Sequence, residues 1–300
     1  MRPSAGILKK LRKQNRNSLT SDSVTVAGPG AVGITVAVAL SESGKQVVLA
    51  GDPSTQATRK LFSVKNFHGL HAEIPLVPLS SLSSYSDVVL ALKAYDLAEA
   101  VPFVKGISRR ILCLSNGMGF EDVWGSASDK VEYGILTAGF SRISSTETLY
   151  SPGELFCLKG GFAEELFSGS RFSLHSVNDM EDTRWAKWYV NSIINPAGAL
   201  TGLSNNRLRD SELGPVIKRL RKELAVSAPS AEALELAEKM LDELLNNSEN
   251  MCSMLQDIQS GRKTEIDFLT GLASGYSPAA RELTAGIRKL SVAAATGSSC

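Results

Sequence analysis

The N-terminal half of this chain alternates short apolar runs with helical segments. Residues 24–27 form an apolar run, a glycine-rich turn follows at once, and residues 34–43 have a helical pattern that ends at Gly44. Residues 46–50 form the next apolar run. Strand, glycine turn, helix and strand in this order predict a βαβ unit.

The same alternation continues, with predicted strands at 88–92, 111–114 and 133–137 and a helical segment at 96–104. It predicts an α/β fold with a mostly parallel, doubly wound sheet covered on both faces. Residues 148–173 are rich in Gly and Ser, with short β-like pieces. From about residue 178 the pattern is helical, and helices are predicted at 181–200, 211–224, 229–246, 253–259, 265–274 and 278–291.

This shift of pattern predicts two domains in the 300 residues, of which 43% are hydrophobic. We expect a dinucleotide-binding domain at 23–178, a helical substrate domain at 179–292 with a cleft between the two, and a tail at 293–300. Residues 1–20 carry six Lys or Arg and no acid. We therefore expect segment 1–22 to be a basic, disordered extension, although an upstream start or a transit-like peptide stays open.

Charge and composition exclude several classes of protein. Beyond residue 20 the chain has 26 basic and 31 acidic residues, which argues against a nucleic-acid partner. Its apolar runs are too short for a membrane span. The four cysteines have no paired spacing and no histidine cluster nearby, so we expect no metal, no disulfide framework and a cytoplasmic location.

The glycine turn has the spacing of a dinucleotide-binding fingerprint. Gly28 permits the tight turn, Gly30 lets the backbone approach a pyrophosphate, and Gly33 allows close packing of helix on strand. The free N–H groups at the start of the helix favour an anion. A merely structural glycine turn is the alternative, and the predicted cofactor-binding turn comprises Gly28, Pro29, Gly30, Ala31, Val32 and Gly33.

Polar residues follow two of the later strands. Lys93 comes after the 88–92 run, and Asn116 comes after the 111–114 run. Ligands of open α/β sheets bind outside the carboxyl ends of the strands, so both residues are predicted beside a dinucleotide, near its nicotinamide end. A solvated loop lysine and a turn-forming Asn-Gly pair are the alternatives.

Lys187, Asn191 and Asn195 are spaced i, i+4 and i+8 in an otherwise apolar helix. At about 100° per residue they share one face. Burying an amine and two amides costs free energy unless they meet hydrogen-bonding partners, so this stripe predicts the wall of a binding site. A solvated stripe on a surface helix is the alternative.

The segment 253–267 contains two patterns that resemble capping boxes, Ser253 with Gln256 and Thr264 with Asp267. Each could simply start a helix. Glu265 would then occupy the first helical position, where the helix dipole favours an ionised carboxylate.

These motifs together resemble the ketopantoate reductase (2-dehydropantoate 2-reductase) family. The similarity runs in order from about residue 23 to 290, over the glycine turn, Leu92-Lys93-Ala94, Asn116-Gly-Met-Gly119, the Lys187 to Pro196 run and the 253–267 segment. It implies a Rossmann-type domain followed by an all-helical C-terminal domain of the 6-phosphogluconate-dehydrogenase type. It also implies NAD(P)H-dependent reduction of 2-dehydropantoate to (R)-pantoate, on the route to coenzyme A.

The resemblance also implies roles for individual residues. Lys187 would be the proton donor to the developing alkoxide, and Glu265 would orient the substrate hydroxyl and bias the protonation of the lysine. Lys93 and Asn116 match residues on the nicotinamide side. The residues that match substrate-binding positions are Asn191, Asn195, Asn205 and Ser253.

Two positions depart from the family pattern. Asn206 replaces a glycine that often follows the asparagine at 205, and Asp52 stands where an arginine is usual. The family default is NADP(H). Asp52 lies nineteen residues beyond Gly33, near the offset at which an acid binds the ribose 2′-hydroxyl of NAD(H), so either cofactor is open. If the loop turns Asp52 away, the residues that follow it could bind the 2′-phosphate of NADP(H). These residues are Ser54, Thr55, Arg59 and Lys60.

Two other functions stay open. The chain could reduce another branched 2-oxo acid, or it could be a regulatory protein that senses the dinucleotide. A sensor would need the glycine fingerprint but not Lys187, Asn191, Asn195 and Glu265. A homodimer is a candidate assembly.

Overall fold

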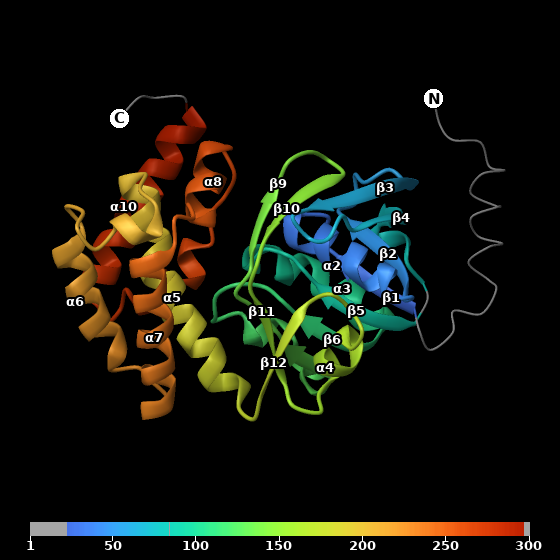
Figure 1. The fold of residues 1–300 in the computed structure, drawn as a ribbon, viewed down its shortest axis with the longest axis horizontal. Coiled ribbons are helices and arrows are strands. Elements are labelled where there is room, and N and C mark those ends of the chain that lie inside the picture. The colour runs from blue at the N-terminus through green and yellow to red at the C-terminus, as the bar shows by residue number, and fades with distance from the viewer. Residues whose placement is uncertain (1–22, 84, 297–300) are drawn as a thin grey trace. The chain divides into compact units, whose positions relative to one another are not determined.

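The computed structural model describes residues 23–83 and 85–296, so the expected basic extension 1–22 lies outside the described residues. Contacts divide the chain into two compact units (Figure 1). The unit that we call the sheet unit contains the described residues up to 92, together with 98–114 and 124–176. The unit that we call the helical unit contains residues 93–97, 115–123 and the described residues from 177 onward.

The sheet unit is built on a nine-stranded sheet of order β7-β6-β5-β1-β2-β4-β3-β10-β9. The neighbours from β7 to β4 all pair in parallel, with β1 between β2 and β5, as in a doubly wound Rossmann sheet. β12, β11 and β8 form a second sheet. The strands are β1 Ser23–Ala27, β2 Gln46–Gly51, β3 Thr58–Lys65, β4 His71–Pro78, β5 Ser86–Leu90, β6 Ser108–Cys113, β7 Val131–Tyr133, β8 Ile135–Leu136, β9 Gly139–Arg142, β10 Glu147–Ser151, β11 Glu154–Leu158 and β12 Ser173–Val177.

Three helices belong mainly to this unit: α2 Ala31–Glu42, α3 Leu97–Ile107 and α4 Phe162–Phe167. Helix α2 packs against β2, β3, β4, β9 and β10, and all eight residues from Gly33 to Leu40 are buried. A helix that is buried on every side needs apolar or small residues all round, which is why α2 has no polar face.

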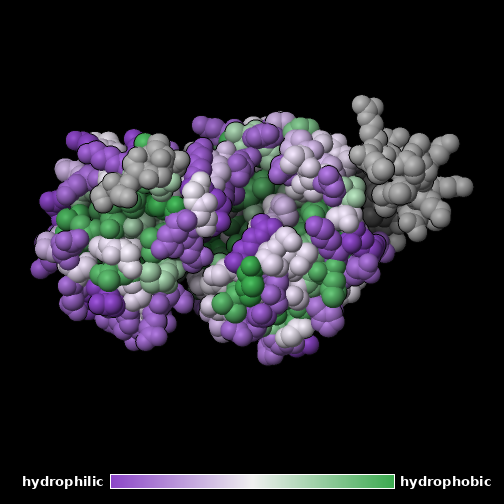
Figure 2. Space-filling model, turned by 90° about the horizontal axis from the view of Figure 1, so that it is seen from above, coloured by the Kyte–Doolittle hydropathy of each residue, from purple (hydrophilic) through white to green (hydrophobic). Residues whose placement is uncertain are grey.

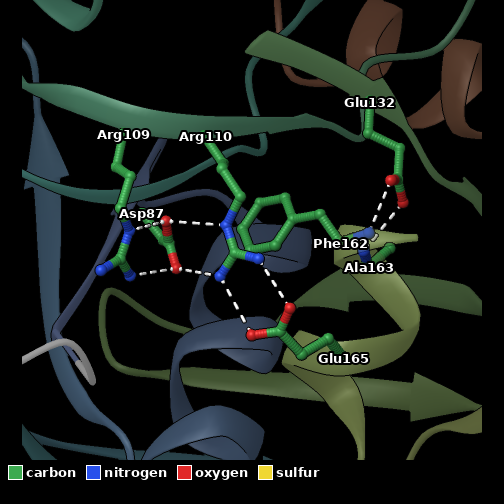
Figure 3. A network of polar contacts seen from close by, with 7 residues as sticks. All are labelled: Asp87, Arg109, Arg110, Glu132, Phe162, Ala163 and Glu165. Carbon is green, nitrogen blue, oxygen red and sulfur yellow. Dashed lines mark hydrogen bonds and ion pairs between the residues drawn. The ribbon is translucent and has the colours of Figure 1, made fainter. Parts of the chain in front are cut away.

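A network of charges ties α4 to the sheet (Figure 3). Asp87 of β5 is buried and accepts hydrogen bonds from Arg109 and Arg110 of β6. Burial alone would raise the pKa of Asp87, but these bonds outweigh it and lower the pKa. Arg110 also pairs with Glu165 and lies over the ring of Phe162, both in α4.

The helical unit packs around α5, Met180–Thr201, which contacts α6, α7, α8, α9 and α10. Asp179 caps its N-terminus, and Gly202, at φ 68°, ends it in the left-handed conformation. Most of the residues of α5 from Trp185 to Ala199 are buried. The other helices are α6 Gly214–Ala225, α7 Ala231–Asn247, α8 Ser253–Gln259, α9 Thr270–Ala273 and α10 Pro278–Thr296, with the 3-10 turns η2 Ala94–Asp96, η5 Asn205–Arg207 and η6 Ile266–Phe268.

The predicted fold class is confirmed, but several elements differ from expectation. The predicted strand 133–137 is split, because β7 pairs in parallel with β6 while β8 pairs antiparallel with β11. The predicted helix 265–274 is also split, into η6 and α9. Strand β5 ends at Leu90, and α10 continues beyond residue 292 into the predicted tail. The sequence did not predict β3 and β4.

Within the described residues no helix combines the length and the apolar character needed to cross a bilayer. The face seen in Figure 2 is mostly hydrophilic, and its apolar patches are interrupted by polar residues.

Candidate active site

The glycine turn of the sheet unit has the shape that a pyrophosphate requires. Gly28 has φ 104°, and a Cβ on Gly33 would lie 1.8 Å from the carbonyl oxygen of Gly28. Neither position can hold a side chain. A Cβ on Gly30 would meet nothing within 4 Å, so the space in front of this residue is open.

Gly30 is also the N-cap residue of α2, and no side chain caps this helix. Its first N–H groups are therefore available to an anion. Pro29, Ala31 and Val32 complete the turn, and Val32 packs on the core of the sheet unit. The residues present fit a dinucleotide.

Asp52 follows the last residue of β2 and is exposed. Its Oδ1 accepts hydrogen bonds from the Ser54 amide at 2.8 Å and the Ser54 hydroxyl at 2.5 Å. These bonds lower the pKa of Asp52, so the carboxylate is ionised at neutral pH. Arg59 lies on β3, and its Nη1 donates to the carbonyl oxygen of Glu73.

The polar stripe of α5 is mostly buried. Asn191 is 9% and Asn195 8% exposed, and Lys187 is only partly exposed. In the part of the chain that the structure describes, no hydrogen bond or ion pair involves these three side chains. Burial without a neighbouring carboxylate lowers the pKa of Lys187 to about 8.

Unpaired polar groups in such surroundings cost free energy, and that cost falls when a ligand supplies the partners. Among the described residues, Lys187, Asn191 and Asn195 therefore do not form a network that stabilises the fold.

Asn205 lies in η5 and is 6% exposed. Its Nδ2 donates to the Ser248 hydroxyl at 3.1 Å, while its Oδ1 is buried without a partner among the described residues. Asn206 binds Ser204 and the Ser248 carbonyl and takes no positive φ. The glycine that is usual in the family is thus not needed for the conformation of this loop.

Glu265 belongs to a buried cluster of charges in the helical unit. Its Oε1 accepts from the Ala94 amide at 3.0 Å, and its Oε2 accepts from Lys93 Nζ at 3.2 Å. Lys93 Nζ also binds Asp257 Oδ2 at 2.7 Å, and Asp257 Oδ1 accepts from Arg262 Nε at 3.0 Å. The Lys93 ammonium is therefore shared by two carboxylates.

Neither of the two possible capping boxes forms. The N-cap of α8 is Cys252, whose Sγ accepts from the Leu255 amide, and Ser253 is exposed at the first helical position. No side chain caps η6, and Asp267 binds Arg288 instead of the local backbone. The capping interpretation of Ser253 and Thr264 is thus wrong.

The turn at Asn116 packs on η6. Gly117 has φ 86°, and a Cβ there would lie 2.7 Å from the Phe268 carbonyl oxygen, which also accepts from the Met118 amide. Asn116 is half-buried beside this turn. The structure therefore places Asn116 near the segment that carries Glu265, as part of the helical unit.

Asp257 was not predicted as a site residue. A signal was present, because Asp257 follows Ser253 by four residues and so shares its face of α8. No group of His, Cys, Asp or Glu in the described ranges could hold a metal ion.

Two family models match this chain. The family model described as ketopantoate reductase PanE/ApbA matches residues 24–155, and the model of the C-terminal part of the same family matches residues 179–275. The 2-dehydropantoate 2-reductase of Archaeoglobus fulgidus is 27% identical over 261 residues, 83% of this chain and 88% of that protein. The enzyme of Vibrio cholerae is 27% identical over 269 residues, with the same coverage of both chains.

Solved structures share the fold. A ternary structure of D-mandelate dehydrogenase with NADH and anilino(oxo)acetate has a TM-score of 0.76 at 19% identity, covering 91% of this chain and 99% of the other. The 2-dehydropantoate 2-reductase of Geobacter metallireducens has a TM-score of 0.75 at 18% identity, covering 89% and 99%. With both family models matched in order along its length, the chain belongs to the ketopantoate reductase family.

Proposed function

We propose that this chain reduces 2-dehydropantoate to pantoate with a nicotinamide dinucleotide as the hydride source. The observation that carries the proposal is the buried stripe of Lys187, Asn191 and Asn195, which has an amine and two amides without partners among the described residues. Membership of the family and the names of the curated relatives support the substrate.

The chemistry of the stripe suits a 2-oxo acid. When bound, the dinucleotide supplies a hydride to the carbonyl carbon, and the fit of Gly28, Gly30 and Gly33 supports its binding at the glycine turn. The Lys187 ammonium stabilises the negative charge that develops on the carbonyl oxygen and donates the proton to it. The amides of Asn191 and Asn195 offer donors that orient the polar groups of the substrate.

A panel of 2-oxo acids with NADH and NADPH tests the proposal. We expect 2-dehydropantoate to give the highest kcat/KM. A tenfold higher value for another branched 2-oxo acid would change the substrate and keep the reductase. Binding of the dinucleotide without turnover of any 2-oxo acid would favour a dinucleotide sensor.

The pKa of Lys187 predicts the alkaline side of the pH profile. Proton donation needs the ammonium, so kcat/KM for the reduction should fall about tenfold per pH unit above pH 8. The reverse oxidation needs the neutral amine and should rise over the same range. Initial rates in both directions from pH 6 to 10 check this, and a reduction rate that stays flat to pH 9.5 would contradict it.

We propose that Asp52 makes the protein accept NADH as well as the NADPH that is usual for the family. The ionised carboxylate would repel a 2′-phosphate and could bind a ribose 2′-hydroxyl. The side chains of Arg59 and Lys60 oppose this preference if the loop turns Asp52 away.

Asp52→Arg tests the assignment, because it replaces the repelling charge by one that attracts the phosphate. We expect the ratio of kcat/KM for NADPH over NADH to rise about tenfold, or about 1.4 kcal/mol. Ser54→Ala, measured alongside at one ionic strength, should have a smaller effect. An unchanged ratio would show that Asp52 does not face the ribose.

A further inference from the structure

Asp257 is a buried carboxylate to which neither the sequence nor the proposed reaction gives a role. It lies near the end of α8 and is 5% exposed. Lys93 Nζ lies 2.7 Å from its Oδ2, and Arg262 Nε lies 3.0 Å from its Oδ1. The Asp257 carbonyl oxygen also accepts from the Arg262 amide. Both side-chain oxygens are thus engaged.

Asp257 competes with Glu265 for the same ammonium. Lys93 lies closer to Asp257, at 2.7 Å, than to Glu265, at 3.2 Å. Among the described residues, the other oxygen of Glu265 has only the neutral Ala94 amide as a donor. Arg262 adds a second cation beside Asp257, and no ion pair of the described residues links it to Glu265.

We propose that Asp257 is a positioning residue that holds the Lys93 ammonium away from full pairing with Glu265, and so keeps this carboxyl group protonated to higher pH than the ion pair alone would allow. The inference rests on the proposed function and on the role at the substrate that the family resemblance implies for Glu265. Asp257 need not touch the substrate for this role.

The electrostatics of the cluster agree with the geometry. Burial raises the pKa of Glu265, and the charge of Lys93 and the Ala94 amide offset this only in part. Burial acts to lower the pKa of Lys93, but Glu265 and Asp257 together outweigh burial, and the pKa is raised. An ammonium held charged between two carboxylates is what the proposal requires.

Further groups surround the cluster. Burial raises the pKa of Tyr95 to about 12, so its phenol stays neutral over the working range, and its hydroxyl donates to the Lys263 carbonyl. Lys93, Asp96, Asp257 and Glu265 act on Tyr95 through their charges, and Lys263 lies over its ring. Arg262 pairs with Asp257, and Asp267 and Arg288 form an exposed pair.

Asp257→Asn tests the proposal, because it keeps the size of the side chain and removes its charge. Lys93 then pairs with Glu265 alone, and the pKa of Glu265 should fall by about one pH unit. The primary readout is the ¹³C NMR titration of the Glu265 carboxyl in glutamate-labelled protein, identified by its loss in Glu265→Gln. The second readout is the corresponding limb of the kcat/KM profile.

Arg262→Gln is the matched control. It also removes a partner of Asp257 and loosens the same loop, but it leaves the Asp257 and Lys93 pair in place. It should therefore not lower the pKa of Glu265. A purely structural role for Asp257 predicts instead that both variants lose stability and that neither moves the titration.

The proposal is overturned if the Glu265 titration stays in place in Asp257→Asn, or if Arg262→Gln lowers it equally. If Asp257→Asn does not fold, the double variant with Arg262→Gln, which leaves no unpaired guanidinium, is measured in its place. The NMR titration needs no turnover, so a shift without activity on 2-dehydropantoate would support Asp257 while the proposed substrate fails.

Discussion

Replacing Lys187 by methionine is expected to lower kcat for 2-dehydropantoate by about 10²–10⁴-fold, with binding of the dinucleotide unchanged. The ammonium is the proton donor of the proposed reaction, and methionine keeps an unbranched side chain in its place. Steady-state kinetics and a dinucleotide titration measure the two effects. Lys239 is an exposed lysine of α7, so Lys239→Met serves as the control and should keep the parental rate.

The same variant should also be more stable than the parent near neutral pH. The pKa of Lys187 is lowered to about 8 in the native state, against about 10.4 in the unfolded chain. Stability linked to this depressed pKa is therefore present above pH 10.4 and is lost as the pH falls through 8. Methionine has no ionisable group, so the variant does not lose stability in this way.

Lys187→Met should therefore raise the free energy of unfolding more at pH 7 than near pH 10. We expect the two gains to differ by about 1–3 kcal/mol, after allowance for the partial exposure of Lys187. Chemical denaturation at both pH values measures it. A kcat within threefold of the parent would reject Lys187 as the donor, and a gain that does not vary with pH would contradict the lowered pKa.

The second large effect is expected at Glu265. Glu265→Gln removes the charge that faces Lys93. It also replaces one of the two acceptor oxygens by an amide donor, which then faces another donor, either the Lys93 ammonium or the Ala94 amide. We expect kcat/KM for 2-dehydropantoate to fall about 100-fold, or about 2.7 kcal/mol. Because Asp257 still pairs with Lys93, the free energy of unfolding should fall by less, about 1–2 kcal/mol.

Ser253→Ala provides the comparison on α8. Cys252 caps this helix and Ser253 is exposed. Replacing Ser253 by alanine should therefore change the free energy of unfolding by less than about 0.5 kcal/mol. The family resemblance implies that its hydroxyl binds the substrate, so we expect Ser253→Ala to lower kcat/KM about tenfold. Thermal melts and kinetics on both variants separate the effects, and a loss of stability alone in both would remove them from the site.

The difference between Ser253 and Glu265 shows where sequence patterns are ambiguous. Ser253 and Thr264, the residue before Glu265, stood in apparent capping boxes, and such boxes depend on local spacing alone. In the structure a cysteine takes the first cap, and Glu265 uses its carboxylate on the Ala94 amide, 171 residues away. A partner that distant leaves no trace in local periodicity.

The split of the predicted helix 265–274 has a similar cause. Its pattern is helical, yet the Phe268 carbonyl accepts a hydrogen bond from Met118 of another segment. An interaction from outside the helix thus competes with its own i to i+4 ladder. In the same way, the neighbouring strands, and not local propensity, decide where β7 ends and β8 begins.

What the sequence by itself determined are the features governed by neighbours in the chain. The β1 to α2 turn follows from Gly28 and Gly33, whose conformation and close packing exclude side chains. The Rossmann-type class and the change to helices follow from hydrophobic periods. The common face of Lys187, Asn191 and Asn195 follows from the geometry of one helix.

Only the tertiary structure decided whether that face is buried and what surrounds Glu265. Segments 93–97 and 115–123 lie inside the predicted first domain, yet they pack with the helical unit. This packing brings Lys93 to Asp257 and Glu265, over more than 160 residues of chain. Charges that meet over such separations depend on how the elements pack, and no local pattern of residues encodes that meeting.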